Sequence, residues 1–525
     1  MDSLLSPLAA RRRRMILLAV CLAALALPLS FAGGAVATPA IGRALPGGPV
    51  ALNWITNAFM LSFGSLLMAA GALADQFGRK RVFLIGVGGF ALASAALGFA
   101  PTLLVVDLLR AAQGAAAAAA LAGGTAALAQ EFDGAARTRA FSLLGTTFGL
   151  GLAFGPVLAG WLIELLGWRA IFATGALVGA LALLVGAPRL RETRDPAAAG
   201  LDWAGAASFT GALSLFTFGV IQAPEDGWTS PLVVGLLAGA AVLAAGFAAI
   251  EARVARPMLD LSLFRYPRFV GVQVLPVATC YCYIVLLVLL PLRFIGIDGY
   301  RALDAGLLML ALSAPMLIVP LVAALLTRWM SAGLIAGVGL LVAAAGLHWL
   351  GAALTEGAGR AALAPMAVIG VGAGLPWGLM DGLSISVVPK ERAGMATGIF
   401  STTRVAGEGI ALAIVGALLA ALVATRLHGI APAAAPHALA EAAARLATGD
   451  LARAAVVLPG VTREDLAAQY RDAFGSLLDG LTVVTAACAV VVFAFLSRVR
   501  ADEAAPRKGG RTSGAGSLVL ERDGG

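Results

Sequence analysis

The sequence predicts an all-α polytopic membrane protein with fourteen transmembrane helices. Hydrophobic residues make up 60% of its 525 residues and charged residues only 13%, whereas soluble proteins average about 25% charged residues. The apolar residues gather in runs of about twenty, which is the length that a helix needs to cross a bilayer. Together these observations exclude a soluble enzyme, a disordered protein and a nucleic-acid binder.

Fourteen apolar runs follow one another along the chain. The first run comes after Arg11–Arg14 and resembles a cleavable signal peptide, but it is longer than an ordinary signal sequence and thirteen runs follow it. We therefore interpret it as an uncleaved first helix. The predicted spans are residues 15–35, 50–72, 82–100, 102–126, 140–163, 168–188, 201–222, 231–251, 269–292, 304–327, 331–351, 361–388, 396–424 and 475–497.

The distribution of basic residues predicts the orientation. The net charge is +8, and Arg and Lys are concentrated in the two tails and in the connections after even-numbered runs, such as residues 79–81. Basic residues favour the cytoplasmic side of a membrane. We therefore expect an integral protein of the cytoplasmic (inner) membrane with both termini in the cytoplasm.

Little of the chain is expected outside the bilayer. Residues 1–14 form a cytoplasmic tail in this interpretation, and the polar residues 498–525 form a disordered cytoplasmic tail. Residues 425–474 form a long extracytoplasmic loop, which is rich in Ala and contains helix-compatible stretches at 439–447 and 463–474.

The chain lacks sequence signatures of catalysis and of cofactor binding. Its lysines do not stand in a phosphate-binding loop, so no nucleotide is expected. Its four cysteines lie in apolar runs, with neither disulfide nor zinc spacing. We therefore predict no enzyme activity, no metal and no cofactor.

A short motif of small and charged residues joins the second and third runs. Gly71 and Gly78 permit close helix approach and a sharp reversal. Asp75 can pair with a nearby arginine or cap a helix, and such a pair could hold two helical bundles closed in one state and release them in another. Arg79 and Lys80 taken alone also fit a simple cytoplasmic anchor.

Two charged residues lie inside the fourth run, where charge is costly. Asp107 and Arg110 are three residues apart and share a helix face. They form either a self-contained structural pair or a site for protons or substrate.

Small residues line one side of the fifth run. Gly151, Gly155 and Gly160 favour tight helix packing. Pro156 removes a backbone hydrogen bond and bends the helix. Two interpretations of this pattern stay open: the small residues serve only tight helix packing, or the helix acts as a hinge or as a leak-tight seal between helices.

These motifs resemble those of the major facilitator superfamily, specifically the fourteen-helix drug:proton antiporter family of the EmrB/QacA type. The resemblance covers about residues 15–497. The matching positions are the cytoplasmic gate motif at residues 71–81, the arginine motif at Arg110, Gln113 and Gly114, the antiporter motif at Gly151, Gly155, Pro156 and Gly160, and the segments 54–56 and 303–306.

The resemblance implies a major facilitator fold. Two six-helix bundles would comprise residues 15–188 and 269–497, with two extra central helices and their linkers in residues 189–268. It also implies that the fourth and twelfth helices line a central cavity. The implied energy source is a proton gradient.

The first helix departs from the family pattern. Ser30 stands where family members often carry an acidic residue, and no charged residue occurs between Arg14 and Arg43. A proton-coupled antiporter needs a titratable group that is exposed to the two sides in turn. The coupling acid must therefore lie elsewhere.

The candidates are the acids that we expect to be buried in the membrane, namely Asp107, Asp381 and Glu408. Glu408 is roughly 18 Å into the thirteenth helix, and Arg404 lies one turn before it. Arg404 matches a basic residue of the family, whereas Glu408 replaces a small one. Glu408 either exchanges protons for cationic substrates or forms a static bridge with Arg404. Asp381 either joins this site or pairs with a loop arginine near the cytoplasmic mouth.

The favoured function is therefore multidrug efflux, the export of lipophilic or cationic small molecules in exchange for protons by alternating access. The alternative in the same fold is a dedicated exporter of one metabolite or natural product, or an importer. A membrane enzyme or sensor would need catalytic residues gathered at one face, and the sequence shows none. The expected partners are a small-molecule substrate and the lipid bilayer, and an envelope-spanning partner protein stays an open question.

Overall fold

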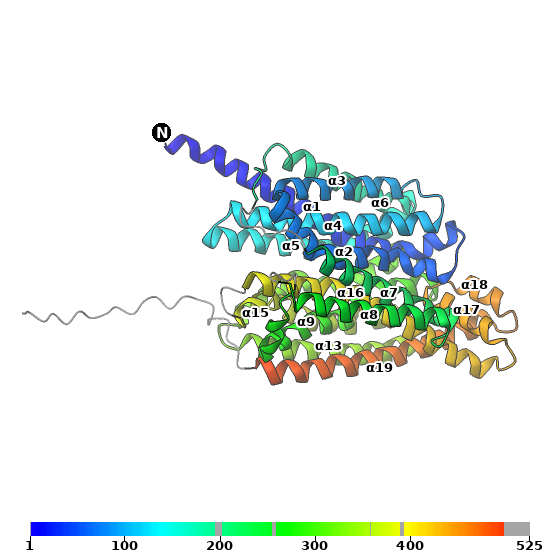
Figure 1. Cartoon of the computed structure of the whole chain (residues 1–525). Coiled ribbons are helices and arrows are strands. Elements are labelled where there is room, and N and C mark those ends of the chain that lie inside the picture. The colour runs from blue at the N-terminus through cyan, green and yellow to red at the C-terminus, as the bar shows by residue number, and fades with distance from the viewer. Residues whose placement is uncertain (1, 195–201, 255–258, 357–358, 389–392, 498–525) are drawn as a thin grey trace, which may run out of the picture.

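The chain is built from long helices that lie side by side (Figure 1). The computed structural model describes residues 2–194, 202–254, 259–356, 359–388 and 393–497. Over these residues there is no strand, and fourteen helical segments are long and apolar enough to cross a membrane. The predicted all-α polytopic fold class is confirmed.

Each of the first six spans is one continuous helix. Gly78 and Gly167 have positive φ angles of 116° and 83° at two of the reversals, where a side chain would be strained. The helices are α1 (Asp2–Ala44), α2 (Pro49–Phe77), α3 (Arg79–Leu97), α4 (Leu103–Glu131), α5 (Gly134–Leu166) and α6 (Arg169–Gly186).

Two further spans, α7 (Trp203–Asp226) and α8 (Pro231–Glu251), pack against each other. Side-chain caps begin both helices: Asp202 accepts a hydrogen bond from Gly205 N (2.8 Å), and Ser230 accepts one from Val233 N (3.3 Å). Helix α7 also packs against both α2 and the later helix α16 (Ala393–Ile430). It therefore contacts both halves of the protein.

Three of the last six spans are interrupted. A π-helix breaks the ninth span, the tenth restarts at Pro315, and the twelfth breaks after Trp377. The elements, besides α16, are η1 (Leu261–Arg265), α9 (Pro267–Thr279), η2 (Cys280–Ile284), α10 (Val285–Gly296), α11 (Ala302–Ser313), α12 (Pro315–Leu326), α13 (Ala332–Glu356), η3 (Arg360–Ala362), α14 (Leu363–Trp377), α15 (Met380–Ser386) and α19 (Arg463–Leu496).

Two short helices, α17 (Pro436–Ala447) and α18 (Leu451–Val457), cover one end of the molecule. We call this end the cap end, and we call the opposite end, where α1 begins and α19 ends, the tail end (Figure 1). Within residues 425–474, α16 continues to Ile430, and helices α17 and α19 include the helix-compatible stretches predicted at 439–447 and 463–474; the extracytoplasmic location of this segment stays a prediction.

The N-terminal residues are helical. Helix α1 begins at Asp2, and the part of it that is long and apolar enough to span a membrane begins at Ala10, so the cytoplasmic location of residues 1–14 stays a prediction. The predicted disordered tail 498–525 lies outside the described residues, as do 195–201 and 255–258 of the predicted linkers.

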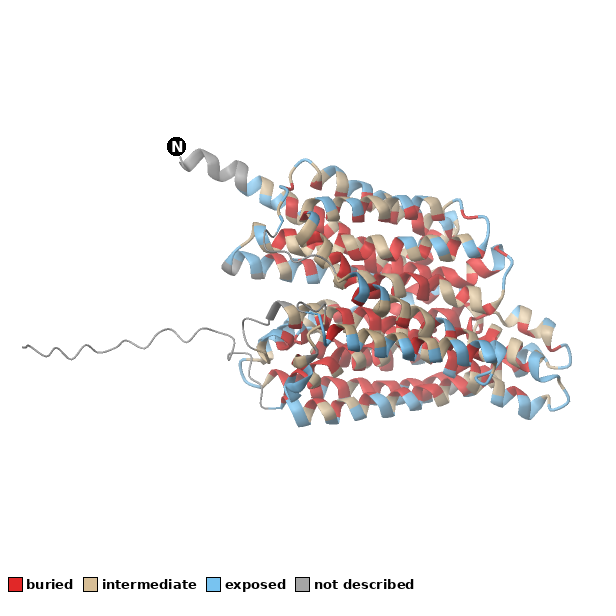
Figure 2. Cartoon of the chain, viewed as in Figure 1, coloured by how far each residue is buried: buried red, intermediate tan, exposed pale blue. Residues whose placement is uncertain are grey.

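The seam between helices α1–α6 and helices α9–α19 is tight toward the cap end and loose toward the tail end. A Cβ added to Gly64 or to Gly306 would lie 2.6 Å from backbone atoms of the other half. Gly71 lies on the same face of α2 as Gly64, nearer the tail end. A Cβ added to Gly71, or to Gly145 of α5, would meet nothing within 4 Å. Buried residues fill the interior of both halves (Figure 2).

Two glycines of α3 provide a test of the packing inside the first half. A Cβ at Gly86 would lie 2.3 Å from Ala120 N, whereas one at Gly88 would touch only Leu183 Cδ1 at 3.9 Å. We expect Gly86→Ala to destabilise the protein by about 1–3 kcal/mol through overpacking, and Gly88→Ala to leave stability unchanged. Thermal unfolding in detergent measures both, and equal melting temperatures would contradict this description of the α3–α4 contact.

Candidate functional site

Arg110 is the most completely enclosed charge of the first half. Its side chain is 0% exposed. Its Nε donates to the Ile55 carbonyl (2.7 Å), and its Nη1 donates to Ser30 Oγ (3.0 Å) and to Gln113 Oε1 (2.6 Å). Gln113 in turn donates to Ser94 Oγ (2.7 Å). Helices α1, α2, α3 and α4 therefore meet around one guanidinium.

Only neutral groups surround this cation among the described residues. No carboxylate lies within 4 Å of it; the ring of Phe59 lies 4.4 Å from its central carbon, and its Nη2 has no hydrogen-bond partner. Ser30, the position at which the family often has an acid, is one of its acceptors. An acid there would form a buried ion pair with Arg110, whereas this chain supplies a hydroxyl.

Asp107 makes no direct contact with Arg110. No hydrogen bond or ion pair joins the two side chains, and Asp107 Oδ1 is buried without a hydrogen-bond partner. The two groups still lie in electrostatic reach of each other, so the alternatives of a structural pair and of a site for protons or substrate stay predictions.

The gate motif at the tail end is held within the first half. Arg79 donates to Asp75 Oδ1 through Nε (3.0 Å) and Nη2 (2.8 Å), so this pair does not bridge the seam. Glu192, which the sequence did not single out, accepts the backbone N–H groups of Lys80 and Arg81, both at 3.2 Å. It thereby caps α3.

The two glycines of this motif differ in their surroundings. A Cβ at Gly78 would lie 2.3 Å from a carboxylate oxygen of Glu192, and its φ is positive, so a glycine is required there. Gly71 faces open space, so the close helix approach predicted for it is absent from this conformation.

The antiporter motif of α5 faces in two directions. A Cβ at Gly151 or Gly155 would lie 2.4 Å or 2.9 Å from side-chain atoms of α1. A Cβ at Gly160 would instead lie 2.3 Å from the carbonyl oxygen of Ala302 in α11, and the carbonyl of Pro156 lies against Gly306. The same helix therefore packs against its own half and forms part of the seam.

In the second half, Arg404 pairs with Asp381 and not with Glu408. Arg404 Nη1 lies 3.3 Å from Asp381 Oδ1. The rings of Phe400 and Trp377 lie 5.8 Å and 6.0 Å from its guanidinium carbon. The predicted Arg404–Glu408 bridge is therefore wrong for this structure, because the guanidinium reaches across to α15 instead. Asp381 pairs with a helix arginine and not with a loop arginine.

Glu408 is buried without a hydrogen bond or an ion pair in the described part of the chain. It is 9% exposed and lies in electrostatic reach of Arg404 and of Cys280, the first residue of the π-helix η2. On the neighbouring face of α16, a Cβ at Gly64 of α2 would lie 2.6 Å from Ala406 N. Glu408 thus sits beside the seam and next to an irregular helix of a type that is frequent at functional sites.

The predicted site residues do not converge on one cavity. The structure brings together Asp381 and Arg404, and separately Asp75 and Arg79, while Asp107 and Glu408 stand apart from them. One crevice lies at the cap end between α2, α7, α16 and α17, and Asn53, Asn57 and Glu225 provide its polar lining. None of the predicted site residues lines it.

The sequence interpretation also missed a buried charge cluster near the cap end. Arg293 is 0% exposed and its Nε donates to Asp298 (3.1 Å), which also lies 3.6 Å from Arg471. Its Nη2 donates to the Leu354 carbonyl (2.9 Å). The available signal was an arginine directly after the ninth apolar run, which we had interpreted as a span boundary.

Comparison with known proteins shows what the chain is similar to. Residues 18–412 match the family model described as Major Facilitator Superfamily. The chain is 33% identical over 420 residues to multidrug resistance protein Stp of Mycobacterium tuberculosis, covering 77% of this chain and 76% of that protein. It is 30% identical over 412 residues to the tetracenomycin C resistance and export protein of Streptomyces glaucescens, covering 78% and 76%.

Solved structures show the same fold at low sequence identity. A bacterial homolog of the human lysosomal transporter Spinster, described as inward-facing and unoccupied, aligns with a TM-score of 0.63 at 16% identity. The alignment covers 94% of this chain and 98% of that chain.

The two buried arginines make a testable contrast. Arg293→Met leaves the carboxylate of Asp298 buried with one distant partner, and breaking such a pair costs about 3–5 kcal/mol. Arg110→Met leaves neutral hydrogen-bond acceptors and removes a buried cation that has no ion-pair partner, although Asp107 lies in its electrostatic reach. We therefore expect Arg110→Met to lower the melting temperature less than Arg293→Met does, and to lose transport. The reverse order of melting temperatures would contradict this account of Arg110.

Proposed function

Because the chain belongs to the major facilitator superfamily, we propose that it exports lipophilic or cationic small molecules in exchange for protons. The named relatives are a multidrug resistance protein and an antibiotic resistance and export protein. Its fourteen apolar helices make it an integral membrane protein. The proposed energy source is a proton gradient, without nucleotide or cofactor.

The observation that carries the proposal is the isolated carboxyl group of Glu408. A charged carboxylate is costly to bury unless it has a partner. Glu408 has neither a hydrogen bond nor an ion pair among the described residues, and the nearby Arg404 is paired with Asp381 instead. It can therefore be accommodated in two ways: by taking up a proton, or by binding a cation. A cationic substrate and a proton would compete for the same group, which couples export to proton entry.

The position of Glu408 relative to the seam suits this role. Helix α16 packs against α2 of the other half at Gly64 and Gly409, so a rocking motion of the halves changes what surrounds the residues between them. Access to Glu408 from one end or the other would then alternate with the conformation. Asp381 is engaged by Arg404 and is 62% exposed, which makes it less suited to hold a proton away from water.

We also propose the orientation that the basic residues favour. With both termini in the cytoplasm, the tail end is cytoplasmic and the cap end faces outward. In this orientation the two halves are in contact at the outer (cap) end and apart at the cytoplasmic (tail) end, which is an inward-facing state. In the outward-facing state the gate motif of α2 and α3 would approach the other half.

A dedicated exporter of one natural product is the second candidate. The relative named for tetracenomycin C resistance and export favours it. A panel of unrelated cationic and neutral compounds separates the two, because resistance to only one chemical class would identify the dedicated exporter.

Everted membrane vesicles with an acidic interior test the coupling directly. We expect the wild type to drive ethidium into the vesicles and Glu408→Gln to lose the gradient-dependent part of this uptake by at least tenfold. Glu464→Gln, at an exposed acid in the first turn of α19, should behave as the wild type. Equal gradient-dependent uptake by wild type and Glu408→Gln would rule out Glu408 as the coupling acid.

A further inference from the structure

One face of α5 ends in an acid that reaches across the seam. Pro156, Gly160 and Glu164 follow at intervals of four residues and so lie on one helix face. The first two touch the backbone of α11: a Cβ at Gly306 would lie 2.6 Å from the Pro156 carbonyl oxygen, and one at Gly160 would lie 2.3 Å from that of Ala302. The next position on this face is Glu164.

Glu164 caps the N-terminus of α11 from the other half of the protein. Its Oε1 accepts the backbone N–H of Leu303 (3.1 Å), and its Oε2 accepts a hydrogen bond from the guanidinium of Arg301. The first N–H groups of a helix have no partner within the helix, and the N-cap residue Arg301 provides no side-chain cap. A carboxylate at this end also interacts favourably with the helix dipole.

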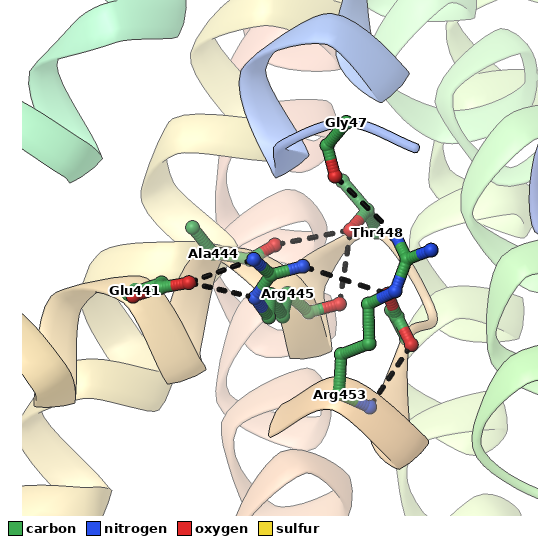
Figure 3. Close-up of polar contacts among 7 residues, drawn as sticks. Gly47, Glu441, Ala444, Arg445, Thr448 and Arg453 are labelled. Carbon is green, nitrogen blue, oxygen red and sulfur yellow. Dashed lines mark hydrogen bonds and ion pairs between the residues drawn. The ribbon is translucent and has the colours of Figure 1, made fainter. Parts of the chain in front are cut away.

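A second contact crosses the seam at the same end. Arg453 of α18 donates to the carbonyl of Gly47 (3.3 Å), in the connection between α1 and α2 (Figure 3). Asp450 accepts the backbone N–H of Arg453 (3.1 Å) and lies 3.8 Å from Arg445, which Glu441 also binds (2.7 Å). Ion pairs inside the cap therefore hold Arg453 in position to reach the other half.

The tail end shows the opposite arrangement in the described part of the chain. Its ion pairs do not cross the seam: Asp75 with Arg79, Glu131 with Arg12 and Glu192 with Arg81 belong to the first half, and Asp381 with Arg404 belongs to the second. Polar contacts across the seam are thus found at the cap end and in the middle of α5, where Ser313 Oγ of α11 donates to the Ala153 carbonyl (3.2 Å).

We propose that Glu164 is the latch of the cap end, and that opening toward this end requires its release from Arg301 and from the Leu303 N–H. The inference rests on the proposed alternating access. A helix cap whose two partners belong to the same bundle would persist when the bundles rock, whereas Glu164 and its partners belong to different bundles and must separate. The hydrogen bond from Arg453 to the Gly47 carbonyl is a second contact between the two halves at the cap end, and it must also break when this end opens.

Spin labels at the cap end measure the opening. Phe99→Cys lies between α3 and α4, and Val456→Cys lies on α18; the two residues are 86% and 77% exposed and belong to different halves. Distances between the labels, measured by double electron–electron resonance in nanodiscs, report the fractions of cap-closed and cap-open protein. Protein without the two added cysteines measures labelling of the native ones.

Three substitutions at the latch give graded expectations. Glu164→Gln keeps an acceptor for Leu303 N–H but loses the charge, and we expect the open-to-closed ratio to rise about threefold. Glu164→Ala loses both contacts, and about tenfold is expected. The exchange of charges in the double variant E164R/R301E restores the ion pair without the cap, so it should fall between wild type and Glu164→Ala.

The matched control is Glu464→Gln, at an acid of the first turn of α19 that is also at the cap end. It should leave the distance distribution unchanged. The latch is overturned if the folded Glu164 variants give the control's distribution, or if the charge exchange opens the cap end as far as Glu164→Ala does. A loss of proton coupling in the vesicle assay with the graded opening intact would overturn the proposed function and leave the latch standing.

Discussion

The cost of burying charge in a membrane protein governs where each titratable group of this chain lies. Inside a bilayer a charged side chain must find a partner or a cavity. Arg404 finds Asp381 and Arg293 finds Asp298. Arg110 is held by carbonyl, hydroxyl and amide oxygens, and Glu408 has no partner among the described contacts. Arg110, Asp107 and Glu408 have no ion pair among the described residues, so a proton or a charged substrate that reaches any of these three buried groups changes its electrostatic energy strongly.

The second constraint is the close approach of helix backbones at glycines. Gly64 in the middle of α2 and Gly160 near the cap end of α5 pack tightly against the other half, whereas Gly71 and Gly145, which lie nearer the tail end, face open space. The seam therefore acts as a pivot that is closed at one end, and the polar contacts of Glu164 and Arg453 occur at that same end. A rocking motion would exchange these contacts for others at the tail end, where the pair Asp75–Arg79 is at present confined to one half.

Much of the fold could be predicted from the sequence, because hydrophobic length and spacing directly reflect the bilayer. The fourteen spans follow from the length of the apolar runs, and the helices α17 and α19 follow from the helix-compatible stretches at 439–447 and 463–474. Partners of long side chains could not be predicted in this way. Arg404 and Glu408 are one turn apart, yet the guanidinium reaches α15, since pairing across helices depends on tertiary geometry that spacing does not encode. Glu192 and Glu164 were missed for the same reason, as both cap helices that are remote in sequence.

The central claim is that a proton and a cationic substrate compete for Glu408. Proton release on substrate binding tests it most directly, with purified protein in weakly buffered detergent solution and a pH-indicator dye. The account predicts that a saturating cationic substrate releases protons from the wild type and none from Glu408→Gln, although the variant still binds substrate. Equal proton release by the two proteins would contradict it.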